Sequence, residues 1–82
     1  MFVAAQVSLY PLRQANLSPA IGVALSIFRE HGLDVSEGTM STLVSGEDGA
    51  LFNALRDAFK VSAEQGDVVM VVTVSNACPA SP

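Results

Sequence analysis

Hydroxyl-bearing side chains are concentrated in one short stretch of the sequence, EGTMSTLVSGEDG, at residues 37–49. The four hydroxyls there belong to Thr39, Ser41, Thr42 and Ser45. Neutral hydroxyl and amide groups offer hydrogen-bond donors and acceptors without burying a charge. These residues could therefore bind a polar small molecule, or they could fill small spaces between two packed surfaces and hydrogen-bond to the backbone.

Residue types that often carry catalysis are sparse in the chain. It has one histidine, His31, and one cysteine, Cys78, which excludes an intrachain disulfide. No motif pairs a nucleophile with a base and an orienting group, and no set of zinc ligands is present. We therefore expect a protein that is not an enzyme, with no catalytic residue, no metal site and no cofactor.

The composition is apolar and mildly acidic. Half of the residues are hydrophobic, 15% are charged and the formal net charge is −4. Such a chain is too apolar to be disordered and has no basic patch for nucleic acid or anionic membranes. The N-terminus lacks the positive region of a signal peptide, and no apolar run is long enough to span a bilayer. We expect a soluble cytoplasmic protein with neither nucleic acid nor membrane as a partner.

The hydrophobic periodicity predicts six elements within a single domain, residues 1–76, followed by a loose tail, residues 77–82. Strands are expected at 2–10, 33–37, 39–44 and 67–75. Helices are expected to begin at the N-caps Ser18 and Ser45 and to end at Gly32 and Gly66. The usual solution for this βαββαβ order is a ferredoxin-like α+β sandwich. Its four-stranded antiparallel sheet has the order 4-1-3-2, with two helices on one face.

The last predicted strand, DVVMVVTVS, is apolar on both of its faces. Two helices cover only one face of the sheet, so Val69 and Val71 would lie on the face that no helix covers. Large exposed apolar patches of this kind mark interaction sites. We therefore expect a homo-oligomer, a tetramer built from dimers, in which another subunit covers this face.

Two segments, VSLYPL at residues 7–12 and GTMSTLVSGEDGALFNAL at residues 38–55, resemble the small thiamine-binding (YkoF-like) protein family. The resemblance implies ferredoxin-like subunits that pair edge to edge and stack their sheets. It also implies a ligand, thiamine or its hydroxymethylpyrimidine part. By position in these motifs, Ser8, Tyr10 and Pro11 match the first, and Met40, Thr42 and Leu43 match the second.

The candidate ligand-binding residues come from the first and third predicted strands and the turn before the third. They are Gln6, Ser8, Tyr10, Glu37, Thr39, Met40, Ser41 and Thr42. Among them, the Tyr10 ring could stack on a cationic heterocycle, and Glu37 could balance its charge.

Side-chain alternation along the third strand leaves one question open. Thr39 and Ser41 point opposite to Thr42, so only one of these sets can share a face with Gln6 and Ser8. The sequence does not decide which. The alternative function is a structural or regulatory oligomerisation module that has the same fold and binds no ligand.

Overall fold

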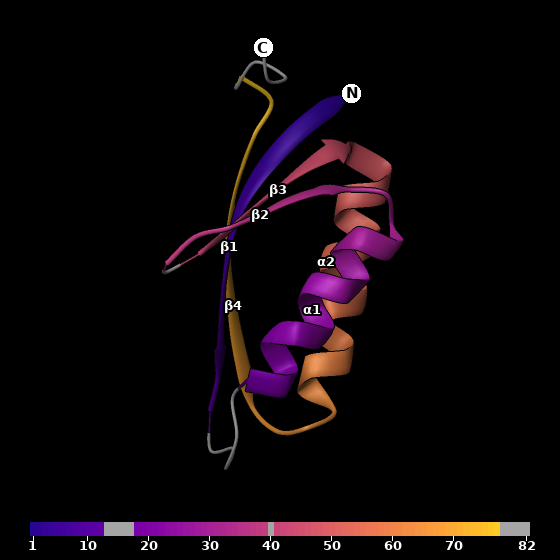
Figure 1. The fold of residues 1–82 in the computed structure, drawn as a ribbon. Coiled ribbons are helices and arrows are strands. Elements are labelled where there is room, and N and C mark those ends of the chain that lie inside the picture. The colour runs from indigo at the N-terminus through magenta and orange to yellow at the C-terminus, as the bar shows by residue number, and fades with distance from the viewer. Residues whose placement is uncertain (13–17, 40, 78–82) are drawn as a thin grey trace.

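The computed structural model describes residues 1–12, 18–39 and 41–77. In chain order the elements are β1 (Phe2–Pro11), α1 (Ser18–Glu30), β2 (Asp34–Glu37), β3 (Thr42–Glu47), α2 (Asp48–Ala63) and β4 (Val68–Ser75). The strands form one antiparallel sheet of order β2-β3-β1-β4, and both helices lie on the same side of it (Figure 1). This confirms the predicted ferredoxin-like fold and its strand order.

The core lies between the sheet and the helices. Every second residue of β1, namely Val3, Ala5 and Val7, is buried on the side that faces the helices. Phe28 of α1 and Leu51 of α2 are almost fully buried against them. The face of the sheet that carries these residues is called the helix face below. The predicted apolar spacing of both helices and of β1 thus serves to build this one core.

The apolar helical spacing predicted from the sequence includes Ile21 of α1 and Phe59 of α2, but both side chains lie outside the core, and Ile21 is 43% exposed. Phe59 is 42% exposed, whereas its neighbour Ala58 is fully buried. Successive residues of an α-helix are rotated by about 100°, and Ala58 and Ser62 occupy the centre of the buried stripe of α2. Phe59 is therefore turned toward the margin of the helix.

The predicted N-cap of α2 is wrong. Ser45 lies within β3, and Glu47 occupies the N-cap position with φ −70° and ψ 145°, without a side-chain capping hydrogen bond. The reason is that β3 pairs with β1 as far as the pair Phe2–Glu47, which holds Ser45 opposite Ala4 in the ladder. By contrast, Gly32 ends α1 with φ 77°, as predicted.

The N-terminal amine joins β1 to the start of α2. The α-ammonium group of Met1 lies 3.2 Å from both Glu47 Oε1 and Asp48 Oδ1, and the Asp48 N–H donates to the Met1 carbonyl at 2.9 Å. The amine donates hydrogen bonds to Glu47 and to Asp48, and these bonds, that to Glu47 most, raise the pKa of the amine. The same hydrogen bond from the ammonium group lowers the pKa of the Asp48 carboxyl. The amine's contribution to stability is lost as the pH rises through its raised pKa, and that of Asp48 as the pH falls through its lowered pKa. These exposed contacts lie at the N-terminus of α2, where the N-cap residue makes no side-chain capping hydrogen bond.

The buried hydroxyl of Ser62 leads to a prediction about stability. Its side chain is 1% exposed, and its hydroxyl has no hydrogen-bond partner among the described residues. A buried, unsatisfied hydroxyl costs free energy, and alanine is also a better helix former than serine. We expect Ser62→Ala to raise the free energy of unfolding by about 1 kcal/mol in urea titrations at one protein concentration.

The matched control is Ser26→Ala in α1, where the serine is exposed. This substitution should give only the gain in helix propensity, a few tenths of a kcal/mol. If Ser62→Ala instead lowers stability, the hydroxyl makes a stabilising hydrogen bond in solution.

Candidate functional site

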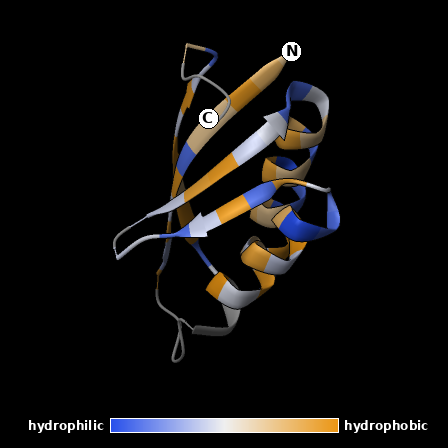
Figure 2. Cartoon of the chain, turned by 45° about the horizontal axis from the view of Figure 1, so that its top comes forward, coloured by the Kyte–Doolittle hydropathy of each residue, from blue (hydrophilic) through white to orange (hydrophobic). Residues whose placement is uncertain are grey.

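The face of the sheet opposite the helices is called the outer face, and no described helix covers it (Figure 1). Directly paired residues of antiparallel strands point to the same side, so the register defines this face. Its residues are Phe2, Ala4, Gln6, Ser8 and Tyr10 of β1; Val69, Val71, Thr73 and Ser75 of β4; Leu43, Ser45 and Glu47 of β3; and Asp34 and Ser36 of β2. Most of these side chains are uncharged, and hydrophobic residues recur along the strands (Figure 2).

The outer face carries large apolar side chains in solvent. Tyr10 is 50% exposed, Leu43 56% and Val71 52%. Val71 is the partner of Ser8 in the ladder, and Leu43 is the partner of Gln6. The exposed apolar surface predicted for Val69 and Val71 is therefore present in the single chain.

A polar pair lies within this apolar surface. Gln6 Nε2 donates a hydrogen bond to Ser41 Oγ at 3.1 Å, which joins the central strand to the residue that precedes β3. Ser8 follows two residues along β1 on the same face. Side-chain alternation in the sequence left open whether Ser41 or Thr42 shares a face with Gln6 and Ser8. The hydrogen bond to Gln6 places Ser41 on that face.

Thr42 lies on the other side of the sheet. It pairs with the buried Val7 and therefore points to the helix face. Its side chain lines a cavity of about 30 Å³ between the sheet and α1, together with apolar residues that include Phe28 and Met70. A cavity of this size has room on the scale of one water molecule, so an aromatic heterocycle does not fit there as the cavity stands.

The remaining predicted residues do not join the polar pair. Glu37 pairs with Thr42 on the helix face, and its Oε2 lies 3.3 Å from Nη2 of Arg29. Thr39 is exposed in the turn between β2 and β3, and Met40 lies outside the described residues. The structure therefore gathers Gln6, Ser8, Tyr10 and Ser41 on the outer face, and separates Glu37 and Thr42 from them.

Two residues next to the polar pair, Leu43 and Thr73, were not among the candidate ligand-binding residues. Gln6 has Leu43 as its partner in β3 and Thr73 as its partner in β4. Thr73 follows Val69 and Val71 at every second position of β4. The alternation of this strand could therefore predict from the sequence that Thr73 lies on the outer face. Only the register, however, places it beside Gln6.

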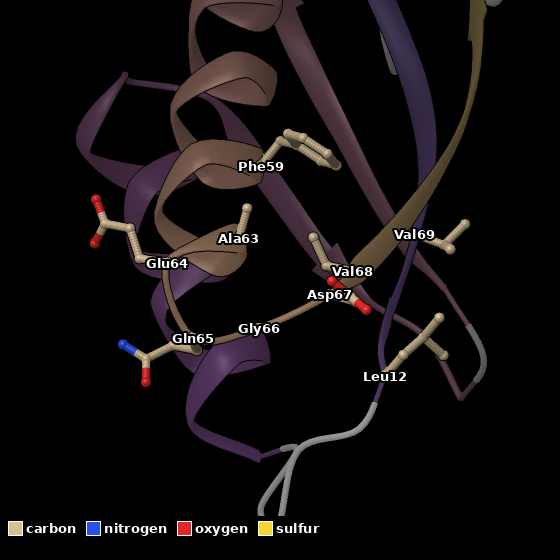
Figure 3. A pocket seen from close by; sticks show the side chains of 9 residues that line it. All are labelled: Leu12, Phe59, Ala63, Glu64, Gln65, Gly66, Asp67, Val68 and Val69. Carbon is tan, nitrogen blue, oxygen red and sulfur yellow. The ribbon is translucent and has the colours of Figure 1, made fainter.

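A larger depression, with a volume of about 630 Å³, lies where α2 ends and β4 begins. Phe59 and Val68 contribute apolar side chains to its lining, and Glu64 and Gln65 point away from them (Figure 3). None of the candidate ligand-binding residues lines this depression. It accounts for the exposure of Phe59 but does not contain the polar pair.

His31 occupies a position between the helices. Its Nδ1 lies 2.9 Å from the carbonyl oxygen of Ile27, and its Nε2 lies 3.2 Å from Asp57 Oδ2 of α2. Within the described part of the chain, no three histidine, cysteine, aspartate or glutamate side chains are arranged to hold a metal ion. None of the described helices is long and apolar enough to cross a membrane.

The described elements define a ferredoxin-like α+β protein with a polar pair on an uncovered, largely apolar sheet face. The model of the YkoF-related family matches residues 2–81, so the chain belongs to the YkoF-related family. This confirms the family resemblance found in the sequence. No curated protein matches the chain.

Solved structures share the fold at low sequence identity. A hypothetical protein from Methanocaldococcus jannascii matches with a TM-score of 0.85 and 23% identity, over 98% of this chain and 84% of that one. A protein from Streptococcus pneumoniae matches with a TM-score of 0.82 and 18% identity, over 92% and 86% of the two chains. A protein from Thermotoga maritima with a proposed role in thiamine biosynthesis or salvage has a TM-score of 0.78 and 16% identity, over 90% and 82%. At these identities the similarity supports the fold alone.

Proposed function

We propose that this protein binds thiamine or its hydroxymethylpyrimidine part, without catalysis, as a homo-oligomer in the cytoplasm. It would serve as a carrier, reservoir or sensor. Family membership and the role proposed for the T. maritima protein support the ligand class. The observation that carries the proposal is the Gln6–Ser41 pair on the exposed apolar face.

The chemistry of the outer face suits a neutral aminopyrimidine. Such a ring presents an amine donor and ring-nitrogen acceptors along one edge, and the amide of Gln6 and the hydroxyl of Ser41 can match both kinds of group. Leu43 and Val71 offer apolar contact, and the Tyr10 ring offers a π-face for the thiazolium cation of thiamine. Small-ligand sites combine a mostly apolar lining with a few polar groups in this way. Amides and hydroxyls bind a ligand without exchanging protons with it, which favours binding over catalysis.

Assembly would complete such a site, because the outer face of one chain is open to water. A second subunit stacked on this face would shield the ligand and cover Val69 and Val71, which are 45% and 52% exposed. The edge strand β4, VVMVVTVS, carries no charged residue. Edges without charges are prone to pair with further strands. The short edge strand β2 is acidic, with Asp34 and Glu37. We therefore propose dimers that pair through β4 and stack through the outer face into a tetramer.

The alternative is a structural or regulatory module that assembles through the same face and binds no ligand. In that case Ser41 and Gln6 would simply satisfy each other at an interface between subunits. Ligand binding by the purified protein separates the two functions.

Calorimetry with thiamine and with the bare hydroxymethylpyrimidine tests the proposed function. We expect binding by the wild-type protein, and an affinity about tenfold lower for Ser41→Ala, because one neutral hydrogen bond is worth about 1–1.5 kcal/mol. Thr42→Val is the matched control, since it changes the next residue at nearly constant volume on the helix face. It should leave the affinity unchanged. A wild-type protein that binds neither compound at millimolar concentration supports the structural alternative, and loss of binding in Thr42→Val alone moves the site to the helix face.

Light scattering tests the proposed assembly. Val71→Lys places a charge on the apolar part of the outer face, opposite Ser8 in the ladder, and burying an unpaired ammonium group is strongly unfavourable. We expect this variant to dissociate or precipitate at micromolar concentration, where the wild-type protein is oligomeric. Asn53→Lys adds the same group on the exposed surface of α2 and should leave the oligomer intact. A monomeric wild-type protein would contradict the proposal.

A further inference from the structure

The side of α2 that faces away from α1 carries two exposed aromatic side chains. Asp57 lies on the other side of the helix, 3.2 Å from His31, the residue that follows α1. Phe52 and Phe59 are 53% and 42% exposed, and their spacing of two helical turns places them on one side of α2. Phe59 and Val68 line the same depression (Figure 3). The depression therefore lies where this aromatic side of α2 meets β4, the uncharged edge strand of the sheet.

The two ends of β4 lie at opposite ends of the molecule. The depression lies at the start of the strand, and the two residues that follow Ser75 lie at the other end (Figure 1). These residues, Asn76 and Ala77, are called the exit segment below. The strand has eight residues and spans about 25 Å. The exit segment therefore cannot reach the depression of its own chain.

An antiparallel partner strand reverses this relation. The end of such a strand lies beside the beginning of the strand with which it pairs. When β4 pairs with β4 of a second copy about a two-fold axis, the same contact occurs twice. The exit segment of each subunit then lies beside the residues that precede Val68 in the other, and Gly66 and Asp67 among these line the depression.

We propose that the depression binds the exit segment of a second copy of this chain, so that the partner's Asn76 and Ala77 lie against Phe59. The inference rests on the pairing through β4 in the proposed function. It adds the surface that the partner covers and the residues that cover it.

The chemistry of the two surfaces is compatible. The exit segment is uncharged, and so is the strand that precedes it. Phe59 and Val68 provide apolar lining for the depression, and Glu64 points away from them (Figure 3). No charged side chain of the exit segment would have to leave water on docking, which avoids the largest cost of burial. Docking would also cover Phe59, a large apolar side chain that the single chain leaves in solvent.

Cross-linking through Cys78, the single cysteine of the chain and the residue after Ala77, tests the inference. Ala63→Cys places a second thiol on the exposed lining of the depression. With oxidised glutathione as the oxidant, we expect a dimer joined by a disulfide between the introduced thiol and Cys78 of the partner subunit. Asn53→Cys is the matched control, because it is an exposed position of α2 about 15 Å from Ala63 along the helix.

The rate of cross-linking and the identity of the linked cysteines are both measured. At micromolar protein, the linked dimer should form at least about tenfold faster in Ala63→Cys than in Asn53→Cys, because docking raises the local thiol concentration toward the millimolar range. Non-reducing electrophoresis separates this dimer from a chain that is linked within itself. A protease that cleaves after glutamate separates position 63 from Cys78 at Glu64, so the peptide masses identify the linked pair.

Three results overturn the inference while the proposed ligand stands, because calorimetry measures ligand binding separately. The two variants form the linked dimer equally fast, neither forms it, or the introduced thiol joins Cys78 of its own chain. Light scattering before oxidation checks that each variant has the assembly of the wild-type protein. A wild-type protein that is monomeric at micromolar concentration overturns the proposed assembly, and this inference falls with it.

Discussion

The antiparallel pairing of β1 with both β3 and β4 is the constraint on which the rest of the structure depends. The central strand places Val3, Ala5 and Val7 under the helices, and the same alternation turns Gln6 and Ser8 to the opposite side. One strand thus contributes both to the core and to the candidate site. Any change in its register would exchange the two sets of residues. The same register therefore places both the core residues and the β1 residues of the candidate site.

The second consequence of this architecture is an uncovered face. The two helices lie on one side of the sheet, and β4 has valines on both of its faces. Exposed apolar surface favours association, and the same surface can line a ligand site once water is excluded from it. In the proposed function these two properties are linked, because a ligand bound only by the oligomer would stabilise it by mass action.

Much of the fold could be predicted from the sequence, since it rests on local patterns. The alternation of β1, the helical stripes and the turn at Gly32 each appear within a few neighbouring residues. The N-cap predicted at Ser45 was wrong for a related reason. The local motif was compatible with a cap, but pairing with β1, a partner about 40 residues away in the sequence, held Ser45 in the sheet. The larger number of hydrogen bonds in the ladder outweighs one capping bond.

By itself the sequence determined the order of the elements, the apolar character of both faces of β4 and the set of residues from which a site could be built. The tertiary structure decided which of them meet. It placed Ser41 against Gln6, turned Thr42 toward α1, and paired Glu37 with Arg29. The physical reason is that alternation fixes only the relative orientation of neighbouring residues within a strand. Which side faces the helices is set by the pairing of Thr42 with Val7, and that pairing joins segments far apart in the chain.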